Sequence, residues 1–155
     1  MRWLLTTLIL LGSLAASSAD DRATGRVVKV LPLLLDLKGH AALSPSLFDR
    51  DAYQAYLRQS TNEISAVRFD VLWSTSHAGQ TGLKLRLELR GTGPDSLPRQ
   101  TTLEQPVTPH FFRHWTSLTL GGDDLKNFGA VTSWRATLWS GEQMIAEQKS
   151  FLWRI

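Results

Sequence analysis

Apolar and polar residues alternate with a period of two over much of this chain. In the most regular run, charged residues separate four leucines: Leu83, Leu85, Leu87 and Leu89. An earlier run places large apolar side chains at every other position: Val67, Phe69, Val71 and Trp73. This period is typical of strands with one face in the core and the other in water. We predict that the two strands form a hairpin through residues 76–82.

Three further segments before residue 121 are strand candidates. Residues 27–37 are strongly apolar, but Pro32 cannot donate to a ladder, which favours an edge strand or a break into two short strands. Residues 100–105 are a candidate short edge strand. Residues 112–120 alternate again, with one side formed by Phe112, Thr116, Leu118 and Leu120.

The last predicted pair of strands covers residues 131–139 and 144–153. Between them lies a short loop, residues 140–143, whose Gly141 suits a positive φ. A short helical turn is predicted at 123–128, with Asp123 or Asp124 as its N-cap.

One amphipathic helix is predicted around residues 46–59. Ser46 followed by Asp49 resembles a capping box. One apolar face carries residues at i, i+4, i+7 and i+8, namely Phe48, Ala52, Ala55 and Tyr56. We expect this helix to lie across an edge or open end of a sheet.

These elements predict a mainly β fold. Six to eight short strands with turns between them favour an antiparallel two-sheet sandwich, Ig-like or fibronectin III-like. A small β-barrel is the alternative. Helices do not separate the strands, which argues against a doubly wound α/β fold.

The first nineteen residues have the layout of a secretory signal peptide. A basic start is followed by an apolar run at 4–14 and by small residues, with Ser17 and Ala19 at the positions that a signal peptidase reads. The apolar run is short for a permanent membrane anchor, which needs about 20 residues. We predict cleavage near Ala19–Asp20, a single domain over 20–155, and a periplasmic or extracellular location without a stable membrane anchor.

Composition narrows the chemistry further. The chain has no cysteine, which excludes disulfides, thiol nucleophiles, iron–sulfur clusters and the acylated cysteine of a bacterial lipoprotein. Seventeen Lys and Arg against fourteen Asp and Glu give a mild net charge of +3. The basic residues are scattered and form no recognisable motif, so we do not expect nucleic-acid binding.

Catalytic and metal-binding patterns in this sequence are weak. His110 and His114 are four residues apart, but in a strand they would lie about 13 Å apart, too far to chelate one ion. His40 and His77 are interpreted as solvated histidines in loops. Neither a nucleophile elbow nor a phosphate-binding glycine loop is present. We therefore expect no catalytic residue, no cofactor and no metal site.

The acidic residues have structural explanations. Asp49, Asp51, Asp123 and Asp124 lie at predicted helix starts, and Asp95 lies in a turn. Asp70 and Glu88, on strands predicted to be adjacent, have arginines as cross-strand partners. A charged recognition surface is the alternative for these strands.

Tryptophan carries the main hint of a binding surface. Large aromatic side chains can fill a core without disulfides. However, Trp134 and Trp139 lie an odd number of residues apart on one predicted strand, so they should point to opposite faces. One of them should therefore lie at least partly outside the core. Trp115 likewise opposes the side that carries Leu118. Exposed indoles and guanidinium groups are enriched in binding surfaces. We predict an interaction surface that includes Arg113, Trp115 or Trp139.

The residues 27–32, 43–47, 51–55 and 147–153 resemble a family of small exported bacterial proteins of Ig-like appearance. The resemblance implies an Ig-like sandwich and brings no activity, ligand or catalytic residue. We therefore favour a non-catalytic module that binds an envelope protein or a polymer such as a polysaccharide. The alternative is a small secreted hydrolase or carbohydrate-processing enzyme with a site assembled from loops.

Overall fold

The computed structural model describes residues 24–76 and 82–154. The predicted signal peptide at 1–19, its cleavage site and His77 lie outside the described residues. In chain order the elements are β1 (Gly25–Asp36), α1 (Leu47–Gln59), η1 (Thr61–Glu63), β2 (Ile64–Thr75), β3 (Leu83–Thr92), β4 (Pro98–Pro106), β5 (His114–Gly121), α2 (Gly122–Phe128), β6 (Ala130–Ser140), β7 (Gln143–Lys149) and η2 (Phe151–Arg154), the two η elements being 3₁₀ turns.

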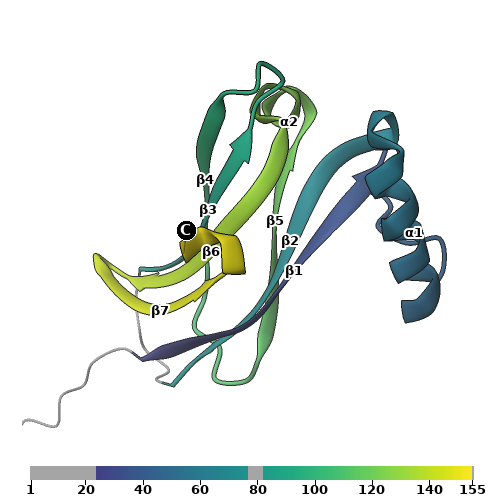
Figure 1. Cartoon of the computed structure of the whole chain (residues 1–155). Coiled ribbons are helices and arrows are strands. Elements are labelled where there is room, and N and C mark those ends of the chain that lie inside the picture. The colour runs from purple at the N-terminus through teal and green to yellow at the C-terminus, as the bar shows by residue number, and fades with distance from the viewer. Residues whose placement is uncertain (1–23, 77–81, 155) are drawn as a thin grey trace, which may run out of the picture.

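Two antiparallel sheets face each other (Figure 1). One contains three strands in the order β1-β2-β5, and the other contains four in the order β4-β3-β6-β7. The predicted two-sheet sandwich is confirmed, and the described strands do not close into a barrel. Edge positions are also as predicted, because β1 with Pro32 and β4 each pair on one side only.

The predicted hairpin between β2 and β3 is wrong. β2 pairs with β1 and β5, whereas β3 pairs with β4 and β6, so the chain crosses from one sheet to the other between them. Alternation tells which side of a strand is buried, and both strands obey it. It carries no information about which strand lies beside which.

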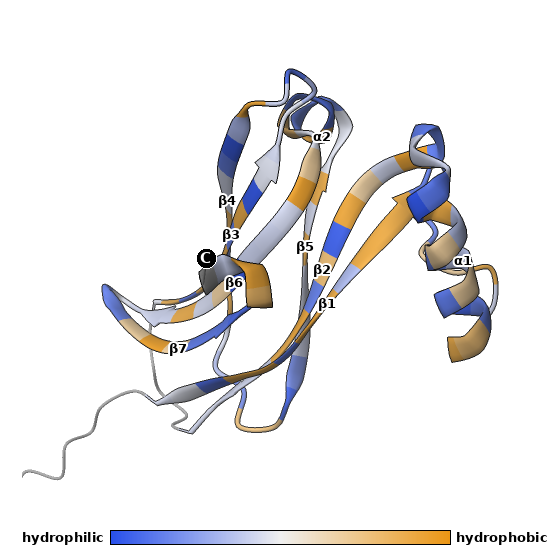
Figure 2. Ribbon diagram, in the orientation of Figure 1, coloured by the Kyte–Doolittle hydropathy of each residue, from blue (hydrophilic) through white to orange (hydrophobic). Residues whose placement is uncertain are grey.

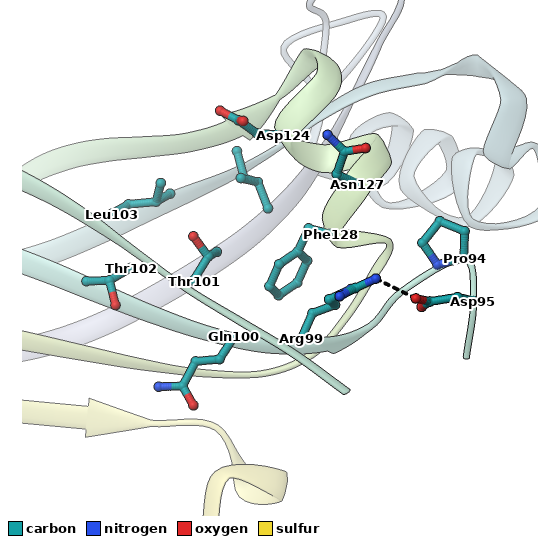
Figure 3. A pocket seen from close by; sticks show the side chains of 11 residues that line it. Pro94, Asp95, Arg99, Gln100, Thr101, Thr102, Leu103, Asp124, Asn127 and Phe128 are labelled. Atoms are coloured by element: carbon teal, nitrogen blue, oxygen red, sulfur yellow. Dashed lines mark hydrogen bonds and ion pairs between the residues drawn. The ribbon is translucent and has the colours of Figure 1, made fainter. Parts of the chain in front are cut away.

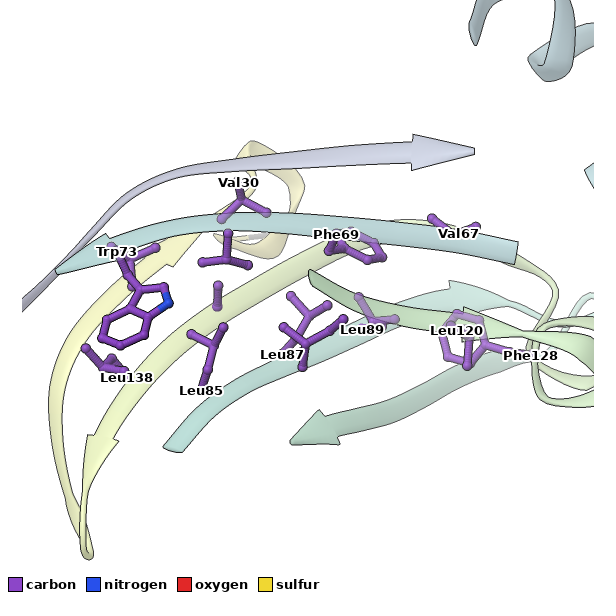
Figure 4. Close-up of a cluster of buried hydrophobic side chains, with 14 residues drawn as sticks. Val30, Val67, Phe69, Trp73, Leu85, Leu87, Leu89, Leu120, Phe128 and Leu138 are labelled. Carbon is purple, nitrogen blue, oxygen red and sulfur yellow. The ribbon is translucent and has the colours of Figure 1, made fainter. Parts of the chain in front are cut away.

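The core lies between the two sheets, where the predicted inner faces meet. Figure 4 shows Phe69 and Trp73 on β2 pointing toward the leucines of β3 and toward Leu138 on β6. The apolar residues of β2 and β3 named above are all buried, and Trp73 is fully enclosed. Its indole N–H donates to the Thr116 hydroxyl at 2.9 Å, which satisfies the one polar atom that the ring brings into the core.

The helix α1 forms where predicted but packs with the opposite face. The Ser46 hydroxyl caps it by accepting from the backbone N–H of Asp49 at 3.3 Å. Its buried residues are Gln54 and Leu57, whereas the predicted apolar face is exposed. Polar contacts explain the choice, because the Gln54 amide hydrogen-bonds to the backbone of the edge strand β1.

The C-terminal elements differ from prediction in detail. The β6–β7 hairpin is confirmed, with Gly141 at φ 57° in its turn, but β7 ends at Lys149 and the next residues form η2. The N-cap of α2 is Gly121, so the predicted caps Asp123 and Asp124 lie inside its first turn instead.

Candidate functional site

Residues 109–115, here called the aromatic loop, carry the most exposed aromatic pair in the described chain. Phe111 is 70% exposed and Phe112 is 81% exposed, and their rings meet edge to face at 5.4 Å. The prediction that Phe112 shares the inner face of β5 is wrong, because β5 begins only at His114. Figure 2 shows this apolar tip at the lower end of the molecule, beside hydrophilic residues at the start of β5.

The base of the aromatic loop is held in place. The carbonyl of His110 accepts from the backbone N–H of Thr75 at 2.7 Å. The imidazoles of His110 and His114 stack with their ring centroids 3.9 Å apart. Both rings also lie edge to face with the buried Trp73, at centroid distances of 5.7 Å for His110 and 6.0 Å for His114. The separation expected for a strand does not apply, because His110 lies in the loop and folds back over His114.

Positive charge accompanies these aromatic rings. Arg113 is exposed, and the sequence has no acidic residue between Glu104 and Asp123. Trp115 is 45% exposed on the outer face of β5, two residues from Arg113. The predicted residues Arg113 and Trp115 are thus both exposed, and they follow the two phenylalanines closely in the chain.

Trp139 lies elsewhere. It is half-buried on the outer face of β6, in the four-stranded sheet, so the sandwich separates it from Trp115 on the three-stranded sheet. The Arg86 guanidinium sits 4.6 Å from the centroid of its ring, and its indole N–H donates to Thr137 at 2.8 Å. The three predicted surface residues thus do not form one patch.

Around Trp139, the outer face of the four-stranded sheet is a network of paired charges. Glu104 bonds to Lys84 at 2.9 Å and to Arg86 at 2.5 Å, and these two contacts lower the pKa of its carboxyl. Arg135 contacts Glu147 at 2.7 Å and Glu88 at 3.5 Å. Because these charged side chains pair with one another, the alternating charged residues of these strands are explained without a ligand.

Asp70 and Glu88 are not neighbours, contrary to prediction. Asp70 lies on β2, in the three-stranded sheet, and pairs with Arg68 at 2.9 Å and with the Ser117 hydroxyl at 2.6 Å. Glu88 lies on β3, in the other sheet, so the two carboxylates are on opposite outer faces. The error follows from the wrong hairpin between β2 and β3.

An open polar hollow of about 740 Å³ lies between β4 and α2 (Figure 3). Asp95 is paired with Arg99 at 2.5 Å and also accepts from the backbone N–H of Leu97 at 3.1 Å. Figure 3 places Asp124 across the hollow from Asp95, with Asn127 and Phe128 between them. The two carboxylates do not converge as an acid–base pair requires.

A larger apolar groove of about 980 Å³ opens where the two sheets diverge. Leu34 on β1 and Phe69 on β2 line one wall, and Leu125, Val131 and Trp134 line the other. Sequence reasoning missed this groove because it arises from the divergence of the sheets, which no local pattern records. Gln54 and Arg58 of α1 also line it, and Arg58 and Lys126 are the titratable residues in its lining.

A carboxylate and a phenol meet beside α1. Asp36 accepts from the backbone N–H groups of His40 and Lys38, each at 2.8 Å, and from the Tyr53 hydroxyl at 2.8 Å. The His40 backbone bond is the largest cause that lowers the pKa of Asp36, and the bond to Asp36 raises the pKa of Tyr53 to about 12. This cluster closes the turn after β1, and neither Asp36 nor Tyr53 lines the hollow or the groove described above.

The described ranges contain neither a metal-binding cluster nor a membrane-spanning helix. Residues 24–76 and 82–154 contain no group of three or more His, Cys, Asp or Glu side chains placed to hold a metal ion. None of the helices within these ranges has the length and apolar character needed to cross a membrane.

Comparisons with known proteins add no assignment. The chain matches no protein-family model, no curated protein and no solved structure.

Proposed function

We propose that this chain is an exported, non-catalytic β-sandwich protein that binds another envelope protein through its aromatic loop. The observation that carries the proposal is the exposure of Phe111 and Phe112, at 70% and 81%, beside Arg113. Aromatic residues, phenylalanine included, and arginine are enriched at the centre of protein interfaces relative to the rest of the surface.

The held base of the aromatic loop supports this proposal. The Thr75–His110 hydrogen bond and the His110–His114 stack fix both ends of the tip, so less conformational entropy is lost on binding. The two phenylalanine rings are nearly perpendicular, with 88° between their planes. A projecting tip of this shape fits a partner's apolar pocket better than it fits the flat face of a sugar ring.

The test is capture from an envelope extract by the immobilised protein. We expect the wild type to retain a defined set of proteins and the double variant Phe111→Ser/Phe112→Ser to lose them, with an unchanged circular dichroism spectrum. The matched control is Phe151→Ser, since Phe151 is equally exposed at 82% but lies in η2. It should capture as well as the wild type.

Two outcomes would contradict the proposal. If the loop variant and the control retain the same proteins, the aromatic loop is not the binding surface. If an insoluble envelope polysaccharide retains the wild type but not the loop variant, and no protein is captured, the partner is a polymer instead.

A further inference from the structure

The helix α1 carries an apolar face that the fold leaves uncovered. Phe48 is 82% exposed and Tyr56 is 47% exposed, and Ala52 and Ala55 between them are also exposed. Their spacing places all four on one stripe of the helix. Figure 1 shows α1 at the periphery, beside the ends of β1 and β2.

Two further exposed leucines lie at the N-terminal end of α1. Leu43 and Leu47, just before the first turn and at its start, are 72% and 67% exposed. Scattered exposed leucines are ordinary, but large apolar residues that share one exposed face of a helix are typical of an interaction site. Since α1 packs on its own domain through Gln54 and Leu57, the stripe is free for a second molecule.

Charges along one flank of the stripe indicate which molecule. Asp51 and Arg58 are seven residues apart, about two turns or about 10.5 Å along the axis, and so lie on the same flank. The Asp51 side chain is 70% exposed and bonds to Arg50 on its own helix. Arg58 is exposed and has no ion-pair partner among the residues that the structure describes.

We propose that this stripe is a self-association surface on which α1 of a second copy packs antiparallel about a two-fold axis near Ala55. Residues 51 and 58 are equally distant from a point between residues 54 and 55. A two-fold axis at that point therefore brings Asp51 of each copy opposite Arg58 of the other, which forms the same ion pair twice.

The stripe also suits close packing between two such helices. Ala55 lies at the axis and Ala52 lies near it, where small side chains let the helix backbones approach. The larger Phe48 lies farther along the helix, and Tyr56 lies on the flank opposite Asp51. The pair Asp51–Arg50 does not compete, because a carboxylate has room for further donors. An interface that is complementary to itself under a two-fold axis is the usual basis of a homodimer.

The dimer is independent of the proposed function, because α1 and the aromatic loop are different surfaces. It extends that function by giving one particle two aromatic loops, which strengthens attachment to a partner that is itself present in several copies.

Sedimentation equilibrium of the exported, purified protein tests the proposal. We expect the wild type to be dimeric at about 100 μM and to dissociate on dilution. Ala55→Glu places two like charges at the axis and should weaken dimerisation at least about tenfold. Asn127→Glu is the control, since it adds the same charge at an exposed position of α2 and should leave the dimer unchanged.

A charge exchange makes the test specific for this geometry. Asp51→Arg alone and Arg58→Asp alone each oppose like charges and should weaken the dimer, whereas the double variant D51R/R58D should restore wild-type association. A wild type that is monomeric at the highest concentration would overturn the proposal. So would a double variant as weak as the single ones, since the antiparallel pairing would then be absent.

Discussion

Gln54 shows how one side chain closes a sheet edge. Its amide accepts from the backbone N–H of Leu34 and donates to the carbonyls of Leu34 and Ala41, each at 2.8 Å. The amide thus takes the place of a neighbouring strand at this point of β1. Pro32, two residues earlier, has no N–H to offer, so β1 is protected against pairing with another chain.

Replacing Gln54 with the similarly sized Met should destabilise the fold by about 1–3 kcal/mol. The substitution keeps the volume but leaves polar groups of β1 without partners at a position that is only 4% exposed. Urea denaturation measures the free energy of unfolding. The control is Gln59→Met, at the exposed end of the same helix, which should change it by less than about 0.5 kcal/mol. Equal effects would mean that the Gln54 contacts contribute nothing.

Asp36 should make stability depend on pH. Hydrogen bonds in the folded state lower the pKa of its carboxyl below 3.8, so the unfolded chain binds this proton more readily. The contribution of Asp36 is therefore complete above pH 3.8 and is lost as the pH falls through the lower folded-state pKa. Asp36→Asn removes this dependence, so the difference in unfolding free energy between wild type and variant should be constant near pH 7 and shrink below pH 4. A difference independent of pH would contradict this assignment.

At the scale of the elements, the register of β3 allows a sharp comparison. Leu87 is fully buried and lies between Ala136 and Leu103 on the flanking strands, whereas Arg86 points outward. Leu87→Ala should cost about 2–5 kcal/mol, the range for emptying a buried leucine site. Arg86→Ala should cost under about 1 kcal/mol, because its pair with Glu104 is partly exposed. Similar losses in thermal denaturation would mean that the register is wrong.

Elements with strong local patterns could be predicted from the sequence. The faces of β2 and β3, the β6–β7 hairpin and the Ser46 cap all depend on residues within one element or one short turn. The partner of β2 could not be predicted, because pairing between distant strands depends on the packing of both sheets. For α1, the pattern located an apolar face but could not tell whether its own domain covers that face.

The candidate site shows the same division. The alternation along each strand predicts that Trp115 and Trp139 lie outside the core. In the structure Trp115 is exposed and Trp139 is half-buried. It could not show that they lie on opposite sheets, because that depends on the strand order. The alternation pattern could not reveal the His110–His114 stack, because it extends the strand to Phe112 whereas β5 begins only at His114. The exposed Phe111–Phe112 tip therefore became visible only in three dimensions.

At the scale of the whole molecule, stability should be uneven. The core is continuous between β2, β3 and β6, but the apolar groove separates the far end of β1 from β6. The helix α1 is attached beyond this groove, through two buried side chains and the edge of β1. A region with so few buried contacts opens without unfolding the rest.

Hydrogen exchange followed by mass spectrometry should therefore separate two regions. We expect the amides of Leu85–Leu89, in a strand paired on both sides, to exchange only through global unfolding. The amides of α1 should exchange at least about a hundredfold faster, through local opening. The Ala55→Glu variant is the right material, since self-association would otherwise protect α1, and the wild type at high concentration should show that added protection. If α1 in the variant is protected as strongly as β3, the helix unfolds only with the core, and the groove does not divide the molecule.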